Sequence, residues 1–313
     1  MTARALLDRT GALIGLVLVA LVFTALAGTR FLEPGNLELM ARQTAIVAMA
    51  AIGMTAVIVA GGIDLSVGSV ISLTTVVIAV LLRDGVSPIV AGLSGVAAAA
   101  ACGLVNGLLI TRLRVVPFIV TLGTMLIVRG LAKGVADERR VEAPISWLNG
   151  LLRSPSGSWS LPSGIWLVVV VGLATSILLQ YTRFGRHVFA VGSNERMARL
   201  CGMPIDRTKV IVYTLNAALG GLAGVLQFSR LAVGDPTVAV GLELDVIAAV
   251  IIGGGSLLGG RGTIIGTAIG AGIMTVIQVG CSQLGLANWV QQIVTGSIIV
   301  VAVAIDRVRA GRG

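Results

Sequence analysis

Charged residues are scarce in this chain of 313 residues. Asp, Glu, Lys and Arg together make up 12% of the sequence, whereas hydrophobic residues make up 56%. A soluble globular protein carries about twice that share of charge. Many apolar runs approach the roughly 20 residues that a helix needs to cross the hydrocarbon core of a bilayer. The composition therefore excludes an ordinary soluble fold and predicts an all-α polytopic membrane protein, with one transmembrane domain over residues 1–313.

Histidine and cysteine are also nearly absent. His187 is the only histidine, and the three cysteines, Cys102, Cys201 and Cys281, are far apart and form no C-x-x-C pair. This spacing predicts neither a metal site nor a disulfide framework. The apolar spans contain no Ser/His or paired-Asp arrangement, so we expect no catalytic residues and exclude an intramembrane hydrolase.

The chain lacks a nucleotide-binding loop as well. Residues 253–263 are glycine-rich, but a phosphate loop ends in Gly-Lys-Ser/Thr, and the only lysines are Lys133 and Lys209. We therefore expect no cofactor in this chain. If the protein is driven by ATP, another polypeptide must bind and hydrolyse it.

The apolar runs predict about ten transmembrane helices. Their approximate ranges are 11–29, 44–61, 65–82, 88–110, 116–133, 164–180, 210–229, 244–260, 263–281 and 287–305. In this arrangement most basic residues fall on one side, which the positive-inside rule assigns to the cytoplasm. The rule predicts that both termini are cytoplasmic. The net charge of +9 is spread between spans, so we expect contact with membrane lipid and no binding to nucleic acid.

The largest outer segment is residues 134–163. It contains the charged run Asp137–Arg140 and two tryptophans, Trp147 and Trp159. Tryptophans favour the membrane interface, whereas a segment of this length also suits contact with an external partner. Both interpretations remain open.

Residues 181–209 form the longest basic stretch of the chain. Within it, residues 195–202 predict a short amphipathic helix that Ser193 or Asn194 caps and that Gly202 ends before Pro204. Its apolar face consists of Met197, Leu200 and Cys201. Such a face suits either the lipid surface or a groove on a partner protein.

Neutral polar side chains interrupt several apolar spans. Such groups can hydrogen-bond an uncharged, hydroxyl-rich solute, or they can join helices. In GGIDLSVGS at 61–69, two glycines break the helix before Asp64 and Ser66, which either cap the next helix or line a route through the membrane. The residues that we predict for a translocation pathway are Asp64, Ser66, Asn106, Thr121, Asn216 and Gln278.

Glycine-broken apolar stretches occur in both halves of the chain, at 59–69 and 251–260. In transporters, such stretches from two repeats often meet at the binding site, so we hypothesise an inverted-repeat architecture. The G-x-x-x-G spacings at 262–270 and 220–224 predict close helix packing within the chain, with a dimer contact as the alternative.

Several segments resemble the membrane permease subunit of ribose-type sugar ABC importers, within the branched-chain amino acid/ribose permease superfamily. They are GGIDLSVGS at 61–69, NGLLI at 106–110, PFIVTLGTM at 117–125, TRFGRHVFAVGSNERMARLCGM at 182–203 and GLELDVIAAVIIGGGSLLGGRGTIIGTAIGA at 241–271. The resemblance implies a bacterial inner-membrane permease in which 181–209 is the cytoplasmic coupling loop. In this family the coupling helix docks on the ATPase, which implies that contact for Asn194, Glu195, Met197, Ala198, Leu200, Cys201, Gly202 and Met203.

The resemblance also implies partners. They are an ABC ATPase subunit, a periplasmic sugar-binding protein and a second permease copy, in a homodimer or a heterodimer. Related chains often have an alanine pair after the glutamate, where this chain has Arg196 and Met197. The expected function is translocation of a ribose-like monosaccharide, coupled to a separate ATPase, so the chain itself is not an enzyme. The alternatives are a permease for another small polar solute, such as a sugar alcohol, and an ion-coupled secondary carrier in which Asp64 binds the ion.

Overall fold

The computed structural model describes residues 3–153 and 161–310, so Trp159 lies outside the described residues. Within these ranges the chain is almost entirely helical, with one short antiparallel pair of strands. The elements are α1 (Ala3–Ala27), η1 (Thr29–Leu32), α2 (Pro34–Val59), α3 (Val67–Arg83), α4 (Pro88–Leu113), α5 (Pro117–Val135), β1 (Val141–Glu142), η2 (Trp147–Gly150), α6 (Ser163–Tyr181), α7 (Arg183–Ser193), α8 (Glu195–Leu200), α9 (Ile205–Leu231), β2 (Val233–Gly234), α10 (Leu242–Ile252), α11 (Ile264–Gln283) and α12 (Asn288–Ala310).

Six of the described helices are long and apolar enough to cross a membrane, namely α2, α4, α5, α6, α9 and α11. Shorter apolar stretches lie in α1, α3 and α12, at Gly11–Ala27, Val67–Arg83 and Asn288–Ala304. These helices confirm the predicted all-α, polytopic class. They match the predicted spans with one exception.

The exception is the range 244–260, which we predicted to be a complete span. Helix α10 has 11 residues and ends at Ile252. At 1.5 Å per residue it is roughly 16 Å long, about half the thickness of the hydrocarbon core. The run Gly253–Gly255 ends it, and Gly254 has a φ of +93°, a conformation that a continuing helix does not allow. The hydropathy pattern placed these glycines inside the predicted span, although they form a loop.

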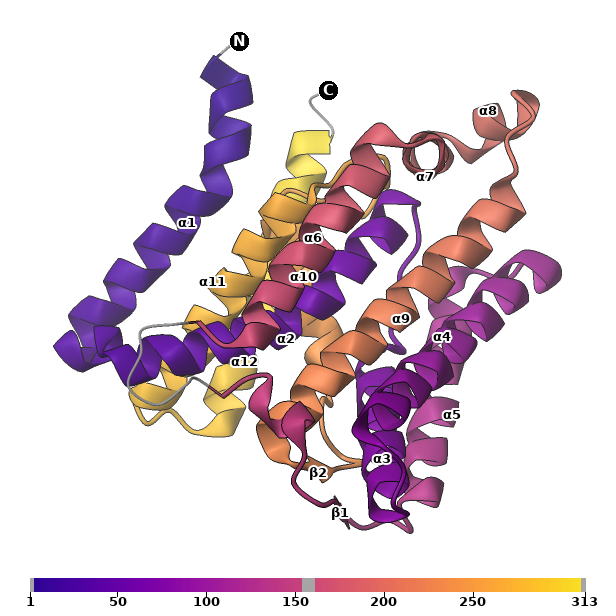
Figure 1. The fold of residues 1–313 in the computed structure, drawn as a ribbon. Helices are drawn as coiled ribbons and strands as arrows, with labels where there is room; N and C mark the ends of the chain where they lie inside the picture. The colour runs from indigo at the N-terminus through magenta and orange to yellow at the C-terminus, as the bar shows by residue number, and fades with distance from the viewer. Residues whose placement is uncertain (1–2, 154–160, 311–313) are drawn as a thin grey trace.

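Helix α2 lies at the centre of the molecule. Helices α1, α11 and α12 lie on one side of it and α3, α4 and α5 on the other, with α6 and α9 between them (Figure 1). The most apolar window of α2 is 83% buried. A helix that is apolar on every face suits such a central position, because protein surrounds it on all sides.

Glycines allow several helices to approach closely. A Cβ atom at Gly107 of α4 would lie 2.7 Å from the Cα of Val210 on α9. A Cβ atom at Gly270 of α11 would collide with the carbonyl oxygen of Ala249 on α10. Gly224 of α9 likewise faces α3. These contacts lie within one chain, as the first interpretation of the G-x-x-x-G spacings predicted.

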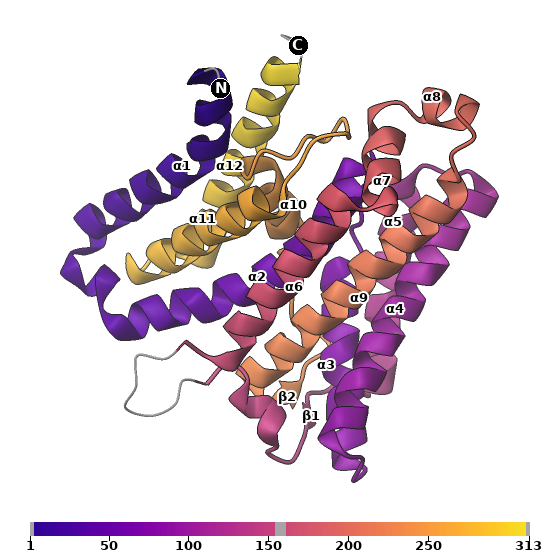
Figure 2. The ribbon, with the colours of Figure 1, turned by 45° about the horizontal axis from the view of Figure 1, so that its top comes forward.

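The two described chain ends lie at the same end of the molecule as α7 and α8, and the strands β1 and β2 lie at the opposite end (Figure 2). The two chain ends thus lie on the same side of the molecule, which agrees with the predicted topology. Residues 181–209 identify that end as the cytoplasmic end by the positive-inside rule.

Candidate translocation and coupling sites

The turn between α2 and α3 holds a buried carboxylate. Asp64 Oδ1 accepts hydrogen bonds from the backbone N–H of Ser66, at 2.9 Å, and from Ser66 Oγ, at 2.6 Å. Gly61, with a φ of +78°, lets the chain leave α2 and turn back. Asp64 therefore stabilises the entry to α3, whereas Ser66 makes no side-chain cap bond of its own.

Side chains from three other helices converge on this turn. Asn216 Nδ2 of α9 donates to Asp64 Oδ2 at 2.8 Å. Asn106 Nδ2 of α4 donates to Ser66 Oγ at 2.9 Å. Thr121 Oγ1 of α5 donates to the carbonyl oxygen of Ile63, in the turn, at 3.3 Å. Residues that are far apart in sequence thus form one hydrogen-bonded group.

All the predicted pathway residues except Gln278 meet here. We call this group the Asp64 cluster, and each member is at most 1% exposed: Asp64, Ser66, Asn106, Thr121 and Asn216. Sequence reasoning missed Tyr213, whose hydroxyl donates to the carbonyl oxygen of Ile63 at 3.4 Å. A single tyrosine in an apolar span has no spacing that would indicate this role.

The hydrogen-bond donors around Asp64 are all neutral among the residues that the structure describes. A carboxylate tolerates burial when such donors replace water. Within the described parts of the chain, the side-chain oxygens of Asn106 and Asn216 have no hydrogen-bond partner. The cluster therefore combines a satisfied carboxylate with spare neutral acceptors, a chemistry that suits the hydroxyl groups of an uncharged solute.

Gln278 lies elsewhere, near the end of α11. Its Oε1 accepts from Gln43 Nε2 of α2 at 2.9 Å, and its Nε2 donates to Asp245 Oδ2 of α10 at 2.6 Å. Gln278 therefore belongs to a second polar group. It does not join the Asp64 cluster.

Helix α8 forms the tip of residues 181–209, the predicted coupling loop, and its ends follow the sequence signals. Asn194 Oδ1 accepts the N–H of Met197 at 3.0 Å, so Asn194 is the N-cap. Gly202, with a φ of +73°, ends the helical turn. The helix itself stops at Leu200.

The predicted apolar face of α8 is exposed. Met197 is 55% exposed and Leu200 81%, and Cys201 is exposed as well. Ala198, by contrast, is only 4% exposed and packs against its own chain, with Met203 partly buried beside it. Ala198 and Met203 therefore pack on the inner side of α8, and Met197, Leu200 and Cys201 form its outward face.

Ion pairs fix α8 to the start of α9. Glu195 contacts Lys209 Nζ at 2.8 Å and Arg199 at 3.1 Å. The hydrogen bond from Lys209 is the main reason that the pKa of Glu195 is lowered, and it outweighs partial burial, which raises the pKa. The orientation of α8 is thus set by charge as well as by packing.

A group of glycines joins the coupling loop to the interior. A Cβ atom at Gly192, near the end of α7, would collide with the carbonyl oxygen of Val59 at the end of α2. The same oxygen accepts the N–H of Gly260 at 2.9 Å. A Cβ atom at Gly61 would lie 3.7 Å from Gly192 Cα. We call Val59, Gly61, Gly192 and Gly260 the glycine junction.

The glycine junction brings together the predicted glycine-broken stretches 59–69 and 251–260. It also places the coupling loop against the turn that bears Asp64. An internal inverted repeat stays a prediction.

Asp306 of α12 holds the glycine loop from the other side. Its Oδ2 accepts from Ser256 Oγ at 3.1 Å and from the N–H of Leu257 at 3.2 Å. The loop that follows α10 is therefore fixed at both ends.

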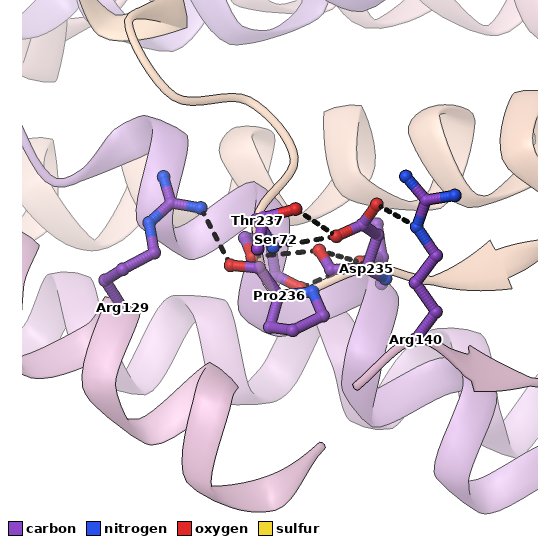
Figure 3. A network of polar contacts seen from close by, with 7 residues as sticks. Ser72, Arg129, Arg140, Asp235, Pro236 and Thr237 are labelled. Carbon is purple, nitrogen blue, oxygen red and sulfur yellow. Dashed lines mark hydrogen bonds and ion pairs between the residues drawn. The ribbon is translucent and has the colours of Figure 1, made fainter. Parts of the chain in front are cut away.

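A polar network orders the opposite, outer end (Figure 3). Asp235 Oδ1 accepts the N–H and the hydroxyl of Thr237 at 2.8 and 2.6 Å, and Arg140 contacts Asp235 Oδ2 at 2.9 Å. Burial raises the pKa of Asp235, but these hydrogen bonds and the charge of Arg140 outweigh it, so the net shift is downward. The bonds fix the segment that leads into α10.

Comparison with known proteins adds to these findings. A profile of the family described as the branched-chain amino acid transport system / permease component matches residues 36–303. The ribose import permease RbsC of Escherichia coli K12 is 39% identical over 298 residues, which cover 93% of this chain and 91% of that protein. RbsC of Bacillus subtilis 168 is 38% identical over 305 residues, with coverage of 96% and 93%. The L-arabinose permease AraH of Azospirillum brasilense is 37% identical over 298 residues, with coverage of 94% and 87%. No solved structure matches the chain.

The chain therefore belongs to the branched-chain amino acid transport system permease family. It is a multi-pass protein of the bacterial inner membrane and a transport subunit of the ABC importer class. The resemblance to ribose-type sugar permeases is confirmed. Permeases of this class work with an ATPase and a substrate-binding partner.

Proposed function

We propose that the chain forms the translocation pathway of an ATP-driven importer for a ribose-like monosaccharide. The observation that carries the proposal is the similarity to permeases named for ribose and L-arabinose, which extends over more than nine-tenths of the chain. The Asp64 cluster supports it, because its spare acceptors are neutral and suit hydroxyl groups.

Uptake of radiolabelled sugar tests the proposal. The permease, with its cognate ATPase and binding protein, is expressed in a host that lacks its own pentose importers. D-Ribose uptake is expected to stop when ATP is depleted and to persist with an uncoupler. The opposite result would favour the ion-coupled carrier and overturn the proposal. Competition by an excess of a sugar alcohol would instead favour the polyol alternative.

The separate ABC ATPase subunit docks on α8, within the cytoplasmic coupling loop 181–209 of a single permease domain. Two observations support this assignment. An apolar face is exposed on a helix that is fixed from behind, and the sequence has no phosphate loop. ATP is accordingly bound by the partner, and this chain carries no cofactor.

Further partners follow from the same proposal. A periplasmic sugar-binding protein delivers the sugar at the outer end, where β1 and β2 lie. A second permease copy, identical or homologous, completes the pathway. Large apolar side chains on the exposed faces of α4, α5 and α6, such as Leu93, Leu126 and Val170, contact lipid. No nucleic acid is involved.

A further inference from the structure

A cavity of about 100 Å³ lies apart from the Asp64 cluster, between α2, α9, α11 and the segment that enters α10. Its polar lining is unusual for such apolar helices and consists of Gln43, Gln227, Arg230 and Gln278. Gln43 lies near the start of α2, and the other three lie near the ends of α9 and α11. Since α2 starts, and α9 and α11 end, away from the cytoplasmic end, the cavity is in the outer half of the protein.

Gln227 lacks a partner although it is buried. It is only 3% exposed, and across residues 3–153 and 161–310 no hydrogen bond engages its amide. Arg230, three residues further along the same face of α9, also has no partner in those ranges. A buried amide is costly to leave unpaired, so Gln227 is available for a ligand, whereas Arg230 is exposed.

The opposite wall presents oriented amides. Gln43 donates to Gln278, and Gln278 donates to Asp245. This chain fixes which amide atoms remain free: the oxygen of Gln43 as an acceptor and one N–H on each glutamine as a donor. Arg230 and Asp245 contribute opposite charges to the region, so the site does not favour a strongly charged ligand.

The third wall is held rigidly. Arg129 of α5 donates to the carbonyl oxygen of Pro236 at 3.3 Å (Figure 3). It also donates to the carbonyl oxygen of Val238 at 2.6 Å. Ser72 of α3 donates to the carbonyl oxygen of Asp235 at 3.1 Å. Val238, which lines the cavity, is therefore fixed before any ligand enters.

We propose that this cavity is part of an outer subsite for a neutral monosaccharide. At about 100 Å³, it takes a hydroxyl-bearing edge of the sugar before the sugar reaches the Asp64 cluster. The proposal rests on the proposed function and adds the place where the sugar first binds the permease. Each sugar hydroxyl both donates and accepts, as the free amide atoms of Gln43, Gln227 and Gln278 require. An amino acid such as leucine would instead place a carboxylate on Arg230.

Two measurements test the subsite in the assembled transporter. The first uses Val238→Cys as a reporter and measures its modification by a charged, membrane-impermeant thiol reagent added from outside. D-Ribose is expected to slow the modification, and L-leucine is not. Wild type is the background control for the native cysteines, of which Cys281 is buried, Cys102 is partly buried and Cys201 is exposed at the cytoplasmic end.

The second measurement is D-ribose uptake at low sugar concentration. Gln227→Leu and Gln278→Leu are each expected to lower uptake about tenfold, which corresponds to about 1.4 kcal/mol. Gln180→Leu is the matched control, because Gln180 is exposed on α6 and lies outside the cavity lining. Membrane levels of all variants are compared, so that a folding defect is not read as lost binding.

The outcomes separate the two proposals. If wild type imports D-ribose, but neither variant is impaired at equal membrane levels and the sugar gives no protection, the subsite is wrong and the proposed function stands. If wild type imports no pentose, the proposed function fails, and protection of the Val238→Cys reporter alone decides the subsite. Protection by leucine rather than ribose overturns the assignment to a sugar.

Discussion

The Asp64 cluster and helix α8 differ in which side chains they bury and which they expose. In the cluster, polar groups are buried among apolar helices and find their partners inside the chain. On α8, apolar side chains are exposed above a basic loop, and the described residues of this chain do not cover them. A change in the cluster should therefore act on folding and on the route, whereas a change on α8 should act on assembly alone.

Asp64→Leu should have the largest effect. It removes the acceptor that pairs with Ser66 and Asn216, and each buried donor left unpaired costs roughly 1–3 kcal/mol. We expect a loss of several kcal/mol in the free energy of unfolding, with low membrane levels and little uptake. Thermal unfolding of the purified permease in detergent measures the first effect.

Asp64→Asn is the matched control for that change. Asparagine is about as good a cap as aspartate, and Asn216 can turn its amide so that its free oxygen accepts from the new side chain. Uptake should largely persist. Loss of uptake in a well-folded Asp64→Asn protein would support the ion-coupled carrier instead.

Gly192→Val tests whether the Asp64 cluster and the predicted coupling loop are coupled through the glycine junction. The new side chain would collide with Val59 at the glycine junction, and overpacking costs about 1–3 kcal/mol. We expect a lower unfolding temperature and lower uptake for each permease that remains in the membrane. Gly123→Val is the control, because nothing lies within 4 Å of a Cβ atom there. Equal behaviour of the two variants would argue against coupling through this contact.

Leu200→Asp should weaken assembly and leave the fold intact. If Leu200 fills a groove on the ATPase, its burial contributes roughly 1.5–3 kcal/mol, so co-purification of the ATPase should fall about tenfold or more. Membrane levels should equal those of wild type, because α8 is exposed. Undiminished co-purification with normal uptake would leave the lipid-surface interpretation in its place.

Glu195 should give the smallest effect, and a pH-dependent one. Its lowered pKa means that its ion pairs stabilise the folded state above the ordinary glutamate pKa of about 4.3 and lose that effect as the pH falls through the lowered value. The side chain is 43% exposed, so the contribution stays below about 1 kcal/mol. Wild type and Glu195→Gln should therefore differ slightly in unfolding temperature at about pH 7 and converge in strong acid. A difference that persists in acid would contradict this assignment.

Local signals predicted local features well. Asn194 and Gly202 bound α8 as expected, because capping depends on neighbouring residues. The position of Gln278 apart from the Asp64 cluster was not predicted, because amides in apolar spans look alike in sequence and only the packing of α11 decides which group each joins. Tyr213 and Arg129 were missed for the same reason, since both act on backbone atoms of segments far away in the chain. The length of α10 was overestimated because hydropathy scores glycine without regard to its conformation.

The bond between Asp306 and the glycine loop sets a limit on how the C-terminus can be shortened or extended. A reporter joined after residue 310 leaves the carboxylate in place and is a fair probe of topology. A chain cut before residue 306 would lose the acceptor for Ser256 and Leu257 and free the loop beside Gly260. A truncation chosen to remove a basic tail would then alter the contact between the coupling loop and the transmembrane helices, and a loss of uptake in it would say nothing about the tail itself.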